Sequence, residues 1–573
     1  MDSLLVIIMA LVIVQSSKEN NHLTGAERSP GIQRQTLSYE VINVMNRNVT
    51  YQPIRIKVVY RDMYFELSVE DRERIIGIVI KAVGKISQLL SVFPVQKPIL
   101  LKRSGCHKEW TTGPNKGRCK SIKRNYQSEF CMDTFRIPDY HLDGLYVWNE
   151  LDQDPVRVVY TQGAGVNNTD FILYVDSVTT DVCGFNSVNK VLSYAKVCHV
   201  DQYDRPISGY INLCPHSIVN NIPEKMYKTL LHELFHTLGF SKTHFPYFKT
   251  CQIKDRSLDC QPLGLTIVEE VNGLVRIITP SVLRETQDHF GCTIETKYGA
   301  PLEGKFNNFT SHWDEVLMYG SIMSPDMGMP HVTFIDRITL ALFEDSGWYK
   351  VDYSSADDYL WGKNMGCVDR SEFCLKHEDY ICRNNSAVGC HYLHKDKGYC
   401  KQESNLSCRI YQPQPKGHCF IPRVPDFEEE IFGTSSLCFV SNLTSNYMEK
   451  TSILTGRCYL HKCSMNRDLL VKVHGSDWID CPYGKLIRIR GYRGYIKCPS
   501  SKDIMCPELP DNIPISVTEF SNVIYYASTS TNMSSTDHNS IPSVSSGTNN
   551  NFSINISPSL FIFVYLITQY IVT

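Results

Sequence analysis

The sequence has almost no excess of charge of either sign. Its 58 Lys and Arg stand against 60 Asp and Glu, a formal net charge of −2 over 573 residues. Proteins that bind nucleic acid or acidic membrane surfaces use an excess of positive charge, so we expect neither partner. The one local basic run, residues 116–124, is interpreted as a solvated loop.

An apolar run long enough to span a membrane is missing as well. A spanning helix needs about 20 apolar residues, whereas the apolar segments 4–14 and 560–572 hold 11 and 13 residues. We interpret residues 1–16 as a secretory signal peptide. Residues 510–559 are rich in Ser, Thr and Asn and are predicted to form a stalk. Residues 560–573 are predicted to be the tail of a GPI-attachment signal, cleaved near 545–547; a short single-pass anchor is the alternative.

The sequence contains no Cys-x-x-Cys pair, which a zinc ribbon requires. Its 22 Cys are therefore interpreted as forming disulfides, and with the apolar leader they indicate an oxidising compartment. We expect the protein to be secreted or held on the extracellular face of the plasma membrane. Sequons for N-glycosylation agree with export, and they begin at Asn48, Asn167, Asn308, Asn384, Asn405, Asn442, Asn532, Asn551 and Asn555.

What the sequence does contain is one motif with a specific chemistry, His-Glu-x-x-His at residues 232–236. Residues four apart on a helix are neighbours on one face, so His232 and His236 can bind one zinc ion. Glu233 then lies beside the zinc-activated water as the general base. Pro223 suits the first turn of this helix and Gly239 suits a left-handed cap at its end.

Zinc needs a third protein ligand, and two kinds of position are open for it. His244 follows the motif closely, whereas His312 lies far downstream in Ser-His-Trp and is preferred. Met323, eleven residues after His312, precedes Pro325 by two residues in what is predicted to be a tight turn, and we interpret it as an apolar floor under the metal. Further competing residues are His141, His199 and His216 for the ligand and Met318 for the floor.

The interrupted motif, the long insertion, Ser-His-Trp at 311–313 and the Ile-Met-Ser-Pro turn at 322–325 resemble the leishmanolysin/invadolysin family of zinc metallopeptidases, which are metzincins. Segments 168–175, 204–214 and 340–349 resemble the same family, and the likeness extends from about residue 52 to about 506. The resemblance implies one zinc ion per chain with His232, His236 and His312 as ligands. It also implies Glu233 as the catalytic base and Met323 as the Met-turn residue.

The function implied is that of a zinc metalloendopeptidase acting on proteins or peptides. Glu233 takes a proton from the zinc-activated water and returns it to the leaving amine. The substrate is expected to dock as an extended strand beside a cleft below the strand nearest the motif. The competing hypothesis is a cell-surface adhesion or interaction protein on a peptidase scaffold. The intact set of motif residues argues against loss of catalysis.

The expected fold class is α+β, a metzincin-type peptidase domain with an inserted central subdomain and a disulfide-rich C-terminal domain. We expect strands at 52–60 and near Phe171 and Tyr210, a helix from Ser68 toward Pro94, and a helix over 333–343 behind the Met-turn. The predicted division is a short pro-segment at 17–51, a catalytic subdomain at 52–240, a central subdomain at 241–350 and a Cys-rich domain at 351–509.

The cysteines themselves predict one connection between these parts. Nine Cys precede Cys367 and thirteen lie from Cys367 to Cys506, and because both numbers are odd, at least one disulfide must join the two groups if every Cys pairs. Cys292 is a plausible partner, and Cys251 and Cys260 are close enough in sequence for a local disulfide. Family members often keep the enzyme inactive with a pro-segment Cys, which is absent here because no Cys precedes Cys106.

Overall fold

The computed structural model describes residues 32–507, apart from residues 38–50, 62–66, 133, 184–190, 221, 255–256, 272, 293–296, 327, 377–378, 383–387, 401–407 and 446–452. The predicted signal peptide, stalk and terminal tail, and most of segment 17–51, lie outside the described residues. The described residues belong to one unit, Met1–Glu508. None of the described helices is both long and apolar enough to cross a membrane.

A five-stranded sheet forms the base of the catalytic part, with strand order β1-β12-β13-β11-β3. The strands are β1 (Gln33–Arg34), β3 (Ile56–Tyr60), β11 (Phe171–Asp176), β12 (Ser193–Val200) and β13 (Pro206–Leu213). β11 runs parallel to β3 and β13, whereas β12 is antiparallel to β13. The strands expected near Phe171 and Tyr210 are therefore confirmed, and the expected strand 52–60 is present as β2 (Gln52–Pro53) and β3.

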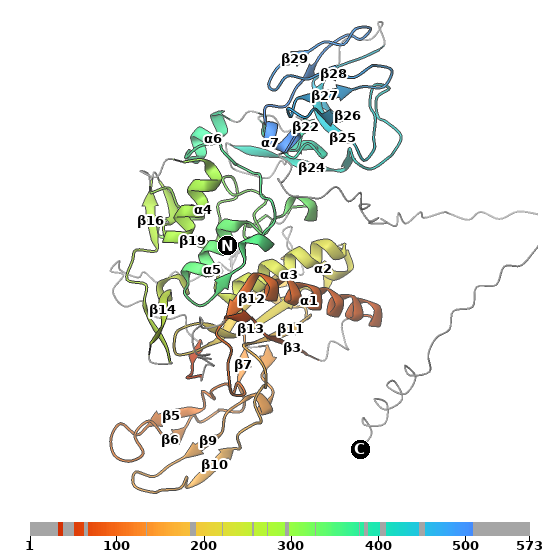
Figure 1. The fold of residues 1–573 in the computed structure, drawn as a ribbon. Coiled ribbons are helices and arrows are strands. Elements are labelled where there is room, and N and C mark those ends of the chain that lie inside the picture. The colour runs from red at the N-terminus through yellow and green to blue at the C-terminus, as the bar shows by residue number, and fades with distance from the viewer. Residues whose placement is uncertain are drawn as a thin grey trace, which may run out of the picture. The chain divides into compact units, whose positions relative to one another are not determined.

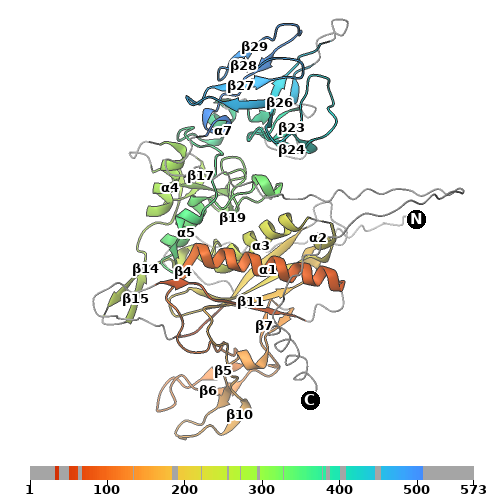
Figure 2. The ribbon, with the colours of Figure 1, turned by 45° about the vertical axis from the view of Figure 1, so that its right-hand side comes forward.

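The two faces of this sheet pack against different parts of the chain. Phe171, Leu173 and Val175 belong to a core shared with the helices, whereas Ile172 and Tyr174 belong to a second core with the 95–142 segment. Successive side chains of a strand point to opposite faces, so β11 is buried on both sides. The helices α1 (Val69–Leu89) and α3 (Pro223–Leu238) lie side by side over the first face (Figures 1 and 2).

Helix α1 begins as predicted but ends earlier. The Ser68 side chain accepts a hydrogen bond from the backbone N–H of Asp71, which caps the first turn. The helix stops at Leu89 instead of running toward Pro94, because the chain continues as β4 (Leu90–Val92). β4 pairs with β2 on one side and with β20 (Lys350–Val351) on the other.

Between β4 and β11 the chain forms several short hairpins. They are β5 (Cys106–Glu109) with β6 (Cys119–Ile122), β7 (Phe130–Cys131) with β8 (Phe135–Arg136), and β9 (Leu145–Val147) with β10 (Arg157–Tyr160). The 3-10 turn η1 (Asp139–His141) lies among them, and the 3-10 turn η2 (Asp181–Cys183) follows β11. The interpretation of residues 116–124 as a loop is wrong for 119–122, which form β6. The Cys106–Cys119 disulfide holds β6 to β5, and the Lys120 ammonium lies 4.1 Å from the Trp110 ring centre.

The residues between His236 and His312 fold as an insertion with secondary structure of its own, as their length predicts. They comprise α4 (Pro280–Phe290), the 3-10 turn η3 (Phe245–Tyr247), the hairpin β14 (Lys249–Lys254) and β15 (Ser257–Pro262), and the sheet strands β16 (Val268–Val271), β17 (Leu274–Ile277) and β18 (Ala300–Lys305). β18 pairs with β19 (Asn308–Trp313), the strand that carries His312.

The helix expected over 333–343 is shifted toward the C-terminus and forms α5 (Arg337–Asp345) after the 3-10 turn η4 (Pro330–Val332). Asp336 caps it by accepting a hydrogen bond from the Thr339 N–H. Phe334 stays extended because its backbone bonds to the Gly320 carbonyl and the Ile322 N–H. These two bonds tie the start of α5 to the predicted Met-turn.

The Cys-rich part contains two antiparallel sheets, with orders β21-β24-β23-β22 and β28-β27-β26-β25-β30-β29. Its elements are η5 (Tyr353–Ser355), α6 (Arg370–Lys376), β21 (Ile381–Cys382), β22 (Val388–Cys390), β23 (Asp396–Cys400), β24 (Arg409–His418), β25 (Ser436–Ser441), β26 (Thr455–Cys463), β27 (Leu469–Lys472), β28 (Ile479–Asp480), β29 (Leu486–Ile487), β30 (Ile496–Lys497) and α7 (Lys502–Met505). The short helix α2 (Pro215–Asn220) belongs to the catalytic part, where it precedes the motif helix. One apolar core nevertheless runs from Ile54 through Leu302 to Ile410, so the three predicted parts share buried surface.

All 22 Cys are paired, and both disulfides anticipated from the sequence are present. Cys292–Cys367 joins the insertion to the Cys-rich part, and Cys251–Cys260 crosses the β14–β15 hairpin. The remaining pairs are Cys106–Cys119, Cys131–Cys198, Cys183–Cys214, Cys374–Cys408, Cys382–Cys400, Cys390–Cys438, Cys419–Cys458, Cys463–Cys506 and Cys481–Cys498.

Candidate metal centre and cleft

Helix α3 presents the two motif histidines from a rigid, buried support. It starts with Pro223 at its first position and ends at Leu238, with Gly239 as the cap. Leu231, Leu234 and Phe235 are fully buried in the main core. Apolar packing on both sides of the motif therefore fixes the direction in which the imidazoles point.

Gly239 is required at the end of this helix. Its φ of +127° lies in a region that residues with a side chain rarely adopt. A Cβ atom placed there would lie 2.9 Å from the Trp348 ring. The turn brings the Phe240 carbonyl back to His236, whose Nδ1 donates to it over 2.8 Å.

Substitution of Gly239 should therefore disturb both the fold and the site. We expect Gly239→Ala to destabilise the protein by about 1–3 kcal/mol, the usual cost of a strained backbone, and to lower its thermal midpoint. The matched control is Gly84→Ala in α1, where an added Cβ meets nothing within 4 Å. That change should raise stability by about 0.5–1 kcal/mol. Equal midpoints for the two variants would contradict the role given to Gly239.

His312 reaches the site from the opposite side, on β19. The Trp313 backbone N–H donates to the Met323 carbonyl over 3.0 Å, and the Trp313 indole donates to the Thr339 hydroxyl over 2.9 Å. Because Trp313 is fully buried, it anchors the strand end that carries His312. In the Ser-His-Trp sequence, the half-buried ligand candidate His312 is therefore followed directly by a residue that anchors the strand in the core.

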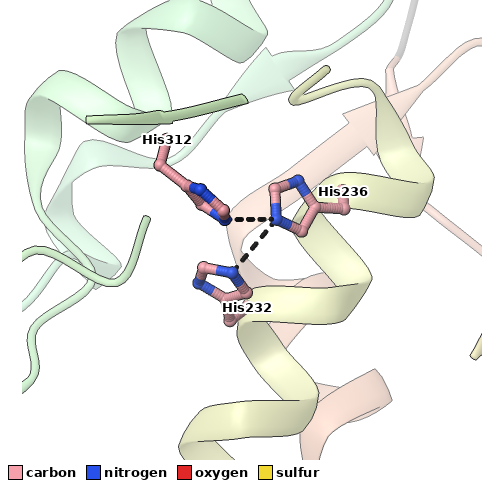
Figure 3. A group of neighbouring side chains, drawn as sticks. All are labelled: His232, His236 and His312. Atoms are coloured by element: carbon pink, nitrogen blue, oxygen red, sulfur yellow. Dashed lines mark hydrogen bonds between the residues drawn. The ribbon is translucent and has the colours of Figure 1, made fainter. Parts of the chain in front are cut away.

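The three imidazoles converge on one point (Figure 3). The Nε2 atom of His236 lies 3.0 Å from Nε2 of His232 and 3.2 Å from Nε2 of His312. The three ligand atoms all lie within 4.8 Å of one another. This is the arrangement that the sequence predicts for a metal ion.

In two of these rings, the hydrogen bond made by Nδ1 determines which nitrogen carries the proton. Nδ1–H of His232 donates to the Ile322 carbonyl over 2.6 Å, and Nδ1–H of His236 donates to the Phe240 carbonyl. Burial, together with the neighbouring imidazoles, lowers the pKa of His232 well below its usual value and that of His236 to about 4. Both Nε2 atoms are then unprotonated and face each other with lone pairs, which fits a divalent cation between them.

Sequence reasoning missed the partner of His312. The Glu303 carboxylate on β18 lies 3.6 Å from Nδ1 of His312, and Thr310 donates to the same oxygen over 2.6 Å. The interaction with His312 lowers the pKa of Glu303. Nothing in the local sequence marks Glu303, because only the β18–β19 pairing brings it to His312.

Glu233 is buried next to the histidines and has one described hydrogen-bond partner. Its Oε1 accepts from the Ser193 hydroxyl over 2.6 Å. Burial raises the pKa of Glu233 to about 7, and the Ser193 hydrogen bond opposes that rise. Ser193 is a second residue that the sequence did not single out, since it stands 40 residues before the motif on β12.

The predicted floor residue, Met323, is fully buried. It follows Ile322, whose carbonyl holds His232, and its backbone N–H is bonded to the Ser321 hydroxyl over 3.3 Å. Met318 is buried to the same extent. The turn that contains Met323 is therefore the one in direct contact with the motif helix.

The competing histidines do not join the group of three. His141 bonds to the Tyr174 hydroxyl and His199 to the Ser208 hydroxyl. His244 packs against Trp348 and approaches the Thr243 hydroxyl at 3.3 Å. Among the described residues, His312 is thus the histidine brought to the motif, and His216 lies outside the group as well.

A cavity of about 880 Å³ opens beside the three histidines. One wall is the start of β12, from Ser193 to Val197, and Glu233 and His244 also line the cavity. β1 pairs with β12 only at His199 and Val200 within the described part of the chain. The strand nearest the motif therefore borders the cleft, as expected.

Comparison with known proteins identifies a peptidase family and several relatives that this chain resembles. The model of the leishmanolysin peptidase family M8 matches residues 156–411 and 401–512. The ciliated left-right organizer metallopeptidase of Xenopus laevis is 35% identical over 504 residues, covering 84% of this chain and 67% of the relative. Its Danio rerio counterpart is 34% identical, with 79% and 74% covered. The leishmanolysin-like peptidase of Drosophila melanogaster is 31% identical, with 58% and 52% covered.

Proposed function

The chain belongs to the leishmanolysin family of metallopeptidases, and on that premise we propose that it is an exported zinc endopeptidase that cleaves peptide bonds within proteins. The observation that carries the proposal is the convergence of three imidazole Nε2 atoms in a cleft that is also lined by Glu233. Imidazole ligands favour zinc over calcium or magnesium, which prefer oxygen.

His232, His236 and His312 would hold one zinc ion per chain through Nε2. When bound, such an ion polarises a substrate carbonyl and lowers the pKa of a water molecule at its open position. The Ile322 and Phe240 carbonyls keep the rings of His232 and His236 oriented through Nδ1. Glu303 orients His312, and Met323 packs in the turn that supports His232.

Glu233 is proposed as the general base and then the general acid. The Ser193 hydroxyl occupies Oε1, so Oε2 is the oxygen that accepts the proton of the attacking water and returns it to the leaving amine. A carboxylate whose pKa is raised by burial is better suited to both transfers than one with an ordinary pKa. Its pKa lies closer to neutral pH, so it can both accept and return a proton there.

The substrate is proposed to bind as an extended strand along Ser193–Val197. A peptide there would add to the edge of the sheet through backbone hydrogen bonds, with its side chains alternating into and out of the cleft. Lys196 on this strand and Lys225 and Lys242 around it also line the cleft. Membrane attachment through a GPI anchor rests on the composition of residues 510–573 alone.

One experiment separates the enzymatic and the anchoring parts of this proposal. Full-length protein on cells should be released by a phosphatidylinositol-specific phospholipase, and the released fraction should cleave casein until a zinc chelator is added. Protein that is active but stays on the cells would overturn the GPI anchor. Protein that is released with bound zinc but never cleaves a protein substrate would overturn the endopeptidase and favour the adhesion hypothesis.

A further inference from the structure

A second cluster of metal-ligating side chains lies outside the cleft. It consists of His331, Asp396 and His418, whose ligand atoms lie within 4.8 Å of one another. Nε2 of His331 is 2.8 Å from Oδ2 of Asp396, and Nδ1 of His418 is 2.5 Å from Oδ1. The three residues come from η4 after the predicted Met-turn and from strands β23 and β24.

The fold holds this cluster in place through backbone pairing. Asp396 and His418 are direct partners on the antiparallel strands β23 and β24, so their side chains stand on the same face. His331 approaches from η4, and its ring packs 5.5 Å from the ring of His418. Phe420 lies against both imidazoles. Cluster geometry is therefore set by regular structure and not by a free loop.

The charge of Asp396 is the feature that needs a partner. Its side chain is completely buried, and among the described residues only His331 and His418 are bonded to its carboxylate. Among the described residues no lysine or arginine is paired with this carboxylate, so a positive charge has to come from the imidazoles or from a bound cation.

We propose that His331, Asp396 and His418 form a second metal site, which binds a divalent transition-metal ion such as zinc. Two imidazoles and one carboxylate form a recognised ligand set for zinc. The ion compensates the buried charge of Asp396. His331 and His418 are 28% and 23% exposed, so water can fill a fourth position.

The bound ion would act as a structural link. η4 lies between the predicted Met-turn and α5, and Asp396 and His418 belong to the Cys-rich part. Phe334, two residues after η4, is bonded to Gly320 and Ile322 in the turn that supports His232. A metal at the cluster would thus fix the Cys-rich sheet to the segment that carries the Met-turn.

Metal content of purified full-length protein tests the proposal without using activity. The wild type should contain two zinc ions per chain by elemental mass spectrometry, and the double variant His236→Ala/His312→Ala should retain one. His418→Gln and His331→Gln should each lower the wild-type content from two to one. The matched control is His474→Ala, an exposed histidine of the same domain, which should keep two.

The outcomes distinguish this site from the catalytic centre. Wild type with one ion, and none in the His236→Ala/His312→Ala variant, would overturn the second site and leave the first intact. If neither His331→Gln nor His418→Gln is secreted, cobalt titration of the His236→Ala/His312→Ala variant decides. One equivalent bound with a visible d–d spectrum supports the second site, and absence of that spectrum overturns it.

Discussion

Replacing Glu233 by Gln should reduce protein cleavage by about 10²–10⁴-fold or more, the usual effect of removing a general base. Gln keeps the volume of the side chain and can still bond to the Ser193 hydroxyl, but it has no carboxylate to accept a proton. Zinc content, secretion and thermal midpoint should stay unchanged, because the three histidines are untouched. Casein cleavage and elemental analysis of the same preparation measure both properties.

The matched control for this variant is Glu224→Gln. Glu224 lies in the first turn of the same helix and is exposed, so cleavage should remain at the wild-type rate. If Glu233→Gln keeps full activity, Glu233 is not the base and the mechanism proposed above is wrong. If cleavage is lost together with zinc, the substitution has damaged the metal centre and the base remains unassigned.

The second large effect is expected for His312→Ala, which should lose the catalytic zinc and with it all measurable cleavage. Losing a residue that only orients a metal ligand lowers metal affinity by about 10–100-fold. Removal of a ligand itself should lower the zinc affinity by more than this. Glu303→Gln, which weakens the support of His312, should fall within that range. Zinc competition with a chromogenic chelator measures these affinities.

The control in this series is His244→Ala. His244 lines the same cavity and was the alternative third ligand from sequence, but it is not part of the three-histidine group. Zinc affinity in this variant should match the wild type. Loss of zinc from His244→Ala with retention in His312→Ala would exchange the two assignments. The Cys-rich part should stay folded in both variants, because disulfides stabilise it.

Some features of the molecule follow from short stretches of sequence. The motif helix was predictable because Pro223, the apolar faces and Gly239 all favour the same element. A disulfide from Cys292 to the Cys-rich part was anticipated because two odd numbers of Cys require a connection when all pair, and the structure makes Cys367 its partner. The local disulfide Cys251–Cys260 follows from closeness in the chain.

Where the sequence misled, a neighbour distant in the chain had altered the local preference. Residues 116–124 are rich in lysine and arginine and were interpreted as loop, but 119–122 pair with β5 as a strand, and the Cys106–Cys119 disulfide joins the two. Residues 333–336 have a helical pattern, but pairing of Phe334 with Gly320 and Ile322 keeps them extended, so α5 starts at Arg337. Local propensity is a weak guide where long-range pairing decides.

The sequence by itself determined the chemistry, because His232, Glu233 and His236 are placed by the helix period alone and a resemblance pointed to His312. Only the tertiary structure decided what surrounds them. Glu303, Ser193 and the Ile322 carbonyl lie 9, 40 and 90 residues from the groups they contact. The same holds for His331, which meets Asp396 across 65 residues. Such contacts depend on strand register and turn geometry throughout the core, so they cannot be predicted from the periodicity of a short stretch of sequence.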